Sequence, residues 1–166
     1  MQGNMNERFP AVVKRIYQDA KVGAASGWTV RAGADSFMAT CAASQTNATL
    51  IVPLTGLEVG DRIVGFHMNG QIESGGNAVS FNIKLASSIP VAAGSTHNAL
   101  TGTTGNTITK AADTALNEDN TKFNLPESAQ IVVESGKAYF AIVTATTPGS
   151  TDIEFLALVL HIKKAY

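Results

Sequence analysis

The residues of this chain best suited to chemistry are three histidines and one cysteine. His67, His97 and His161 lie far apart in the sequence, and none stands at a metal-ligand spacing from another histidine, a cysteine or a carboxylate. Cys41 is the single cysteine, which excludes a disulfide within the chain and a cysteine-based zinc site. Its apolar neighbours favour a buried filler in a strand over a reactive thiol. We therefore predict no metal site, and we expect the histidines to be ordinary surface or interface residues.

The acidic and glycine-rich stretches do not form a recognisable catalytic set either. Glu118, Asp119 and Asn120 lack the alternating ligand spacing and the closing glutamate of a calcium loop, so we expect a solvated turn. Gly102 and Gly105 lie in a threonine-rich loop and not at a strand-to-helix junction, which argues against a phosphate cradle. The Gly-x-Ser-x-Gly phrase of a nucleophile elbow does not occur. These patterns predict a protein that is not an enzyme and that has no cofactor.

The stretch from Asp61 to Ala86 is the one expected to position His67. With Gly75 and Gly76 at the centre of a two-residue turn, it reads as a β-hairpin with one apolar and one polar face. The polar face would place His67 beside Lys84, and a neighbouring cation argues against metal binding. The expected pairs on the apolar face are Ile72/Val79, Gly70/Phe81, Met68/Ile83 and Phe66/Leu85.

Composition narrows the classes of function. Of the 166 residues, 45% are hydrophobic and only 15% are charged, where about 25% charged is usual. A surface built from Thr, Ser, Asn, Gly and Ala suits a protein packed against copies or partners, although an ordinary β protein with a neutral surface is the alternative. The net charge is −1 and no basic stripe exists, which argues against nucleic-acid binding. No segment approaches the roughly 20 apolar residues of a membrane helix, and the start MQGNMNERFP lacks the features of a signal peptide, so we expect synthesis in the cytoplasm.

Residues 1–27 differ from the rest and are predicted to be an N-terminal arm. An apolar stripe at helical spacing favours a short amphipathic helix near residues 10–20, and an extended segment is the competing interpretation. The glycine-rich residues 23–27 would be a hinge. The stripe would dock either on its own β domain or on another chain. Its candidate contact residues are Phe9, Val12, Val13, Ile16 and Tyr17.

Residues 28–166 are predicted to form an all-β domain. Eight or nine strands with a long loop over residues 87–120 favour an antiparallel two-sheet jelly-roll sandwich, and an immunoglobulin-like sandwich is the runner-up. Ala111–Leu116 is expected to be a single helical turn inside that loop, and Ala129–Val133 to be a strand.

The last strand, Asp152 to Lys163, is apolar on both faces. Simple alternation places Ile153, Phe155, Ala157 and Val159 on one face and Leu156, Leu158, Leu160 and Ile162 on the other. One face can cover the core of the domain, and the second would need the arm or a neighbouring subunit. We therefore predict a symmetric oligomer with Leu156, Leu158, Leu160 and Ile162 as candidate interface residues.

The short arm, the Gly/Ala/Thr-rich β domain, the low charge and the terminal strand TDIEFLALVLHIKKA together resemble the cement or decoration proteins of tailed-bacteriophage capsids. The resemblance implies a homotrimer on the outside of the virion that clamps neighbouring major capsid proteins, with residues 1–21 reaching across the capsid surface. It assigns no individual functional residue, because the family has no fixed site.

Two other functions stay open on the sequence. One is a jelly-roll binding module, such as a phage fibre tip or a carbohydrate-binding domain, which needs exposed aromatic residues gathered on one sheet. The candidates Tyr17, Trp28, Tyr139 and Tyr166 are scattered in the sequence. The other is a cupin-type enzyme, which needs a histidine and carboxylate metal cluster that the sequence does not display.

Overall fold

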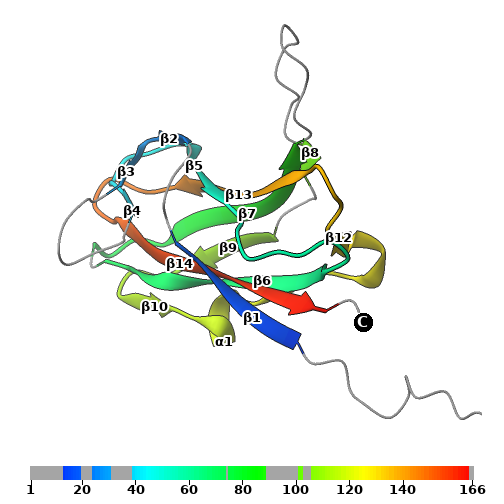
Figure 1. The fold of residues 1–166 in the computed structure, drawn as a ribbon. Coiled ribbons are helices and arrows are strands. Elements are labelled where there is room, and N and C mark those ends of the chain that lie inside the picture. The colour runs from blue at the N-terminus through cyan, green and yellow to red at the C-terminus, as the bar shows by residue number, and fades with distance from the viewer. Residues whose placement is uncertain are drawn as a thin grey trace, which may run out of the picture.

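The structure, a computed structural model, describes residues 13–19, 24–30, 39–73, 75–88, 101–102 and 106–164, and the statements below concern those residues. Two antiparallel sheets pack face to face as a sandwich, with one short helix at the edge of the lower sheet in Figure 1. The prediction of an all-β, two-sheet fold is therefore confirmed. The described part contains no helix long and apolar enough to cross a membrane.

The sheets, called A and B, contain strands from distant parts of the chain. Sheet A contains β1 (Val13–Asp19), β3 (Trp28–Val30), β4 (Ala39–Cys41), β6 (Arg62–Ile72), β10 (Thr114–Leu116), β11 (Phe123–Asn124), β12 (Ile131–Val132) and β14 (Ile153–Lys163). Sheet B contains β2 (Ala24–Ser26), β5 (Ala48–Pro53), β7 (Val79–Ser88), β8 (Thr101–Gly102), β9 (Asn106–Lys110) and β13 (Ala138–Thr146). The remaining elements are α1 (Glu118–Thr121) and a 3₁₀ turn over Glu127–Ala129.

The strand order is that of a jelly roll. β10-β6-β14-β4 lie side by side in sheet A, and β5-β13-β7 lie side by side in sheet B with β9 paired to β7. The chain crosses from one sheet to the other between β4 and β5, between β5 and β6, between β6 and β7, and between β13 and β14. At these four crossings, strands that follow each other in the chain face each other across the core instead of forming hairpins.

The predicted hairpin of residues 61–86 is wrong for this reason. β6 and β7 belong to different sheets, so the connection around Gly75 and Gly76 passes over the end of the sandwich. There it packs on the turn between β13 and β14, where Ser150 Oγ donates to the Gly75 carbonyl at 2.7 Å and Glu73 N donates to the Asp152 carbonyl at 3.1 Å. A Cβ on Gly75 would overlap the Ser150 carbonyl oxygen, so this contact requires glycine.

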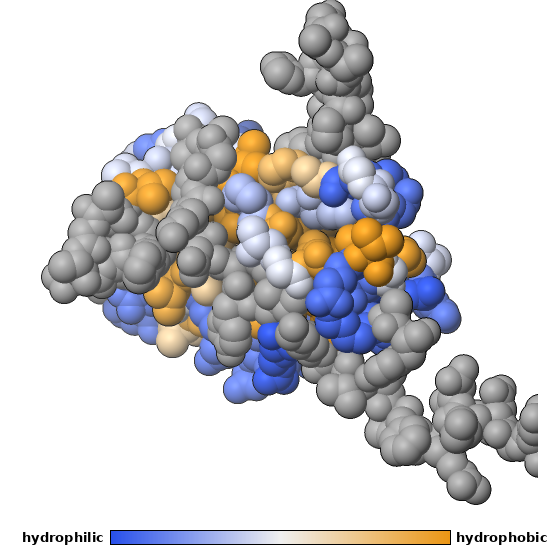
Figure 2. All heavy atoms as spheres, viewed as in Figure 1, coloured by the Kyte–Doolittle hydropathy of each residue, from blue (hydrophilic) through white to orange (hydrophobic). Residues whose placement is uncertain are grey.

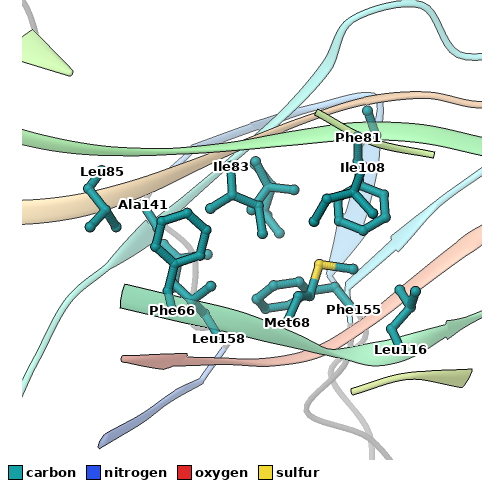
Figure 3. Packing of buried hydrophobic residues seen from close by; sticks show 14 of the residues in the cluster. Phe66, Met68, Phe81, Ile83, Leu85, Ile108, Leu116, Ala141, Phe155 and Leu158 are labelled. Carbon is teal, nitrogen blue, oxygen red and sulfur yellow. The ribbon is translucent and has the colours of Figure 1, made fainter. Parts of the chain in front are cut away.

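The assignment of faces within that stretch is nevertheless correct. Side chains from both strands point into the space between the sheets and fill it (Figure 3). Trp28 closes one side of the core, packing edge-on against Phe155 with ring centroids 6.5 Å apart. The predicted apolar residues that are buried are Phe66, Met68, Ile72, Val79, Phe81, Ile83 and Leu85.

The N-terminal helix is also a wrong prediction. Residues 13–19 form β1, which pairs antiparallel with β14, with Val13 opposite Lys163 and Asp19 opposite Ala157. The extended interpretation holds because β14 has a free edge there whose backbone groups need partners. Ala24–Ser26, expected to be part of a hinge, is a strand paired with β5, and Gly27 supplies the positive φ of +74° that turns the chain into β3.

The last strand departs from simple alternation at one residue. The register with β6 shifts between Phe155 and Ala157, which leaves Leu156 as an extra residue that is 48% exposed. Beyond the bulge the faces exchange, so Leu158, Leu160 and Ile162 are fully buried in the chain's own core. The argument that these three residues need a neighbouring subunit is thus wrong. Of the four interface candidates in this strand, Leu156 alone is exposed to solvent.

Two smaller differences lie between β9 and β13. Thr114–Leu116 pairs with the end of β6 as β10, where a helical turn was expected. The strand expected over Ala129–Val133 is shortened to β12, because Glu127–Ala129 forms the 3₁₀ turn after Pro126. The last strand, expected over Asp152–Lys163, is present as β14 within one residue.

The bulge in β14 gives a direct test of this architecture. Leu158→Ala removes a fully buried side chain and should lower the free energy of unfolding by about 2–5 kcal/mol. Leu156→Ala is the matched control, two residues earlier and at the bulge itself. It should change the free energy of unfolding by less than about 0.5–1 kcal/mol, because the Leu156 side chain is half exposed. Urea unfolding of both variants measures the difference, and equal losses would contradict the bulged register.

Candidate functional site

Two of the three histidines meet on the outer face of sheet A. Phe66 and Met68 point into the core, so His67 between them points outward, and His161 alternates in the same way between Leu160 and Ile162. Because β6 pairs with β14, His67 Nδ1 lies 2.9 Å from His161 Nε2 and the two imidazoles share a hydrogen bond. Only 4% of His67 and 3% of His161 is exposed.

A carboxylate is brought to this pair by α1. Asn117 caps the helix, accepting a hydrogen bond from Asp119 N at 3.0 Å, while Asn120 Oδ1 accepts from Asn117 N at 3.1 Å. At its other end Thr121 Oγ1 accepts from Met68 N at 3.0 Å and donates to the Met68 carbonyl at 2.8 Å. The helix is thereby fixed to the backbone of β6 one residue from His67. Glu118, in its first turn, has Oε1 4.0 Å from His161 Nε2.

Two cations hold the Glu118 carboxylate. Arg15, directly opposite His161 in the β1–β14 register, places Nη2 2.8 Å from the carboxylate oxygens. Lys122 places Nζ 3.0 Å from Oε1, one helical turn further along. Four elements, β1, β14, β6 and α1, therefore meet at one cluster, which we call the histidine cluster: Arg15, His67, Glu118, Lys122 and His161.

The charges in the histidine cluster follow from this geometry. Burial lowers the pKa of His67, and burial together with the neighbouring His67 lowers the pKa of His161, so both rings are neutral at pH 7. The hydrogen bond from Lys122, reinforced by Arg15, lowers the pKa of Glu118 and keeps it ionised. One neutral ring donates to the other, and the two cations flank a single anion.

The arrangement can bind a metal ion in principle. His67, His161 and Glu118 each offer one ligand atom, and these atoms lie within 4.8 Å of one another. Beside them is an open depression of about 480 Å³, lined by Arg15, Val64, Glu118, Lys122, Asn124 and His161. The expectation that the histidines are ordinary surface residues is wrong for His67 and His161, which are buried. The sequence shows no ligand spacing because the fold joins residues separated by 51 and 43 positions. The cluster lies on the outer face of sheet A and not between the two sheets.

Other chemical candidates are placed differently. Lys84 lies on β7 in sheet B, so the expected pairing of His67 with Lys84 is wrong. Cys41 is fully buried in β4, and burial raises the pKa of its thiol to about 11, as a filler residue requires. His97 lies outside the described residues.

The residues expected to contact partners fall in two groups. Val13, Ile16 and Tyr17 lie in β1, whose backbone pairs with the chain's own β14, while Phe9 and Val12 lie outside the described residues. Among the interface candidates of the last strand, Leu156 is exposed and the other three are in the core.

Two of the four aromatic candidates for a carbohydrate platform, Trp28 and Tyr139, are buried. Trp28 and Tyr139 are 7% and 6% exposed, and the Tyr139 hydroxyl accepts a hydrogen bond from Glu134 N at 2.9 Å. Neither ring is free to stack on a sugar. Tyr166 lies outside the described residues.

Sequence reasoning missed the histidine cluster because no spacing reveals it. Arg15, His67, Glu118 and His161 come from four elements that meet only once β14 is inserted between β1 and β6. The one available signal was that Glu118 follows Asn117, a good helix cap, which argues for an ordered turn.

The buried imidazoles predict a pH-dependent stability. Histidines in an unfolded chain have a pKa of about 6.5, and the two buried histidines have lower pKa values in the folded protein. Below about pH 6.5 the unfolded state therefore binds more protons than the folded state, and the free energy of unfolding falls as the pH decreases. The stabilisation is complete above about pH 7 and should decline toward pH 5, by at most about 1.4 kcal/mol per pH unit for each ring. Urea unfolding in EDTA between pH 7.5 and 5 measures the slope.

The double variant His67→Gln/His161→Gln should flatten that slope, whereas His97→Gln, which leaves the pair intact, should keep it. Glu118 does not contribute to the slope between pH 7.5 and 5, because its pKa is lowered and its carboxylate titrates only at more acidic pH. Equal slopes in the wild type and the double variant would show that the pair does not titrate on unfolding.

Comparison with known proteins adds no assignment. No protein-family model matches the sequence, and a search of curated proteins found no match. The function is therefore argued from the residues and their arrangement.

Proposed function

We propose that this chain is a structural protein that decorates and stabilises a bacteriophage capsid by binding neighbouring major capsid proteins. The proposal starts from the resemblance in the sequence and is supported by an exposed apolar region at one end of the sandwich.

The apolar region lies around the β5–β6 loop and the β12–β13 turn. Val59 is 67% exposed and Val132 is 43% exposed. Between the loop and the turn is an open depression of about 440 Å³, lined by Leu54, Leu57, Val59 and Phe140. Val132 is next to Val133, which also lines it. We call Leu54, Leu57, Val59, Val132 and Phe140 the apolar end, and Figure 2 shows hydrophobic surface at this end, near β12, beside hydrophilic residues. Exposed apolar surface rimmed by polar residues is typical of a contact site for another protein.

The N-terminal segment joins the domain at the same end. Val13 lies opposite Lys163, Lys163 opposite Arg62, and Arg62 opposite Val132, so the four residues form one row across sheet A. With strands about 4.8 Å apart, this row places the start of β1 about 15 Å from Val132. The colocation of the apolar end and the start of β1 carries the proposal, because one surface of the shell can then contact both.

The low charge of the chain suits a protein whose surface packs against other protein molecules. Only 15% of the residues are charged, and several of those are used in ion pairs inside the domain. A ligand that binds the assembled lattice and not its free subunits stabilises the lattice by mass action. Three-fold repetition, which the resemblance implies, would let modest contacts act together.

A matched pair of substitutions tests the apolar end. Val132→Asp should reduce co-sedimentation with empty shells of the phage that encodes this chain by at least about tenfold, because it places a charge in the contact. Val30→Asp is the control, since Val30 is 42% exposed on β3, which joins β14 through β4 at the Ile153 end. Circular dichroism checks that both variants fold. Equal capture of both variants would sink the proposed contact surface.

The proposed contact by the N-terminal arm is tested by a deletion that stops before β1, which begins at Val13. Removing residues 1–12 leaves β1 and Arg15 in place, so the domain should keep its melting temperature within about 2 °C while shell capture falls. Removing residues 1–21 should instead lower stability, because β14 loses a paired strand. Normal decoration of shells by the shorter deletion would show that residues 1–12 are not an anchor.

A further inference from the structure

We propose that His67, His161 and Glu118 bind a divalent first-row transition ion, for which Zn²⁺ is the test ion. The ligand atoms are His67 Nδ1, His161 Nε2 and Glu118 Oε1. Two imidazoles and one carboxylate suit zinc and its neighbours and do not suit Mg²⁺ or Ca²⁺, which prefer oxygen ligands. The inference stands independently of the capsid proposal.

The spacing of the ligand atoms fits one ion. Ligand atoms about 2.0–2.1 Å from a tetrahedral zinc ion are about 3.3 Å apart. The two histidine nitrogens, now 2.9 Å apart in a hydrogen bond, must therefore separate by about 0.4 Å. Glu118 Oε1, at 4.0 Å from His161 Nε2, must approach by about 0.7 Å to complete the set. Its side chain is 24% exposed, so a small rotation at the surface suffices. For both nitrogens to bind, the donating imidazole carries its proton on its other ring nitrogen.

The backbone around the ligands is held in place independently of any ion. His67 and His161 lie on the two long central strands of sheet A, and Thr121 fixes α1 to Met68. The register between β14 and β6 shifts again at His161, where Val64 is left without a partner in the pairing. Such irregularities re-aim side chains and are common beside functional sites. The backbone positions of the three ligand residues are thus set before binding, and only side chains need to adjust.

The two cations have different effects on the site. Arg15 contacts both carboxylate oxygens, so it can keep one of them and orient Glu118 while the other turns to the ion. Lys122 pairs with Oε1, the oxygen nearer His161, and competes with the ion directly. His161 and Glu118 also line the open depression, so water can occupy the remaining coordination positions.

The experiment is titration of the full-length, EDTA-stripped chain with Zn²⁺ by calorimetry at pH 7.5, with Co²⁺ absorption as the spectroscopic signature of nitrogen ligands. We expect one ion per chain with micromolar or tighter affinity, and a melting temperature that rises with Zn²⁺. His161→Gln and Glu118→Gln should each weaken binding by at least about 100-fold. Lys122→Gln should tighten it by roughly three- to tenfold, because it frees the carboxylate oxygen.

Glu134→Gln is the matched control, since Glu134 is likewise paired with a lysine, Lys137 at 2.8 Å, but belongs to another part of the fold. It should leave affinity unchanged. The proposal is overturned if the wild type binds Zn²⁺ no more tightly than Glu118→Gln, or if Lys122→Gln weakens binding. Both variants change partly exposed side chains, so the test does not depend on the folding of the His161 variant.

Discussion

One extra residue in β14, Leu156 at the β-bulge, determines which side chains of that strand face the core and which face outward. Without the bulge, alternation from Ile153 and Phe155 would direct His161 into the core and Leu158, Leu160 and Ile162 outward. With the bulge, the three aliphatic side chains complete the core and His161 joins His67 on the outer face. The same residue thus removes a large apolar face from solvent and creates the histidine cluster. A register slip by one residue would reverse both results.

Burial of two imidazoles is costly unless their polar atoms find partners. The ring-to-ring hydrogen bond satisfies one nitrogen on each, and both rings stay neutral because burial lowers their pKa values. Glu118 stays ionised beside them because Arg15 and Lys122 lower its pKa. β1 is therefore more than a strand added at an edge, since it supplies Arg15 to a cluster whose other members lie on β6, β14 and α1.

The sequence predicted the sheets and their inward faces better than it predicted the pairing of strands. In the stretch 61–86, a hairpin and a crossing between sheets bury the same side chains, so alternation cannot tell them apart. The contact of Gly75 with the β13–β14 turn decides between them, and that contact is not local in sequence. The N-terminal segment was ambiguous for a related reason, because its apolar residues fit both periods. The free edge of β14 selected the strand.

Side chains fill the space between the two sheets. Phe66, Phe81 and Phe155 are almost fully buried there, so both candidate sites described above lie on the outside of the sandwich. The outer surface offers two distinct features that β1 connects, since Val13 lies in the row that ends at Val132 and Arg15, two residues later, holds Glu118. Residues 13–19 and 24–26, which the sequence assigned to an arm, are paired strands of the sandwich, so the domain does not begin at residue 28. The ion pair between Arg15 and Glu118 joins β1 to α1, so the histidine cluster helps to hold β1 on the domain.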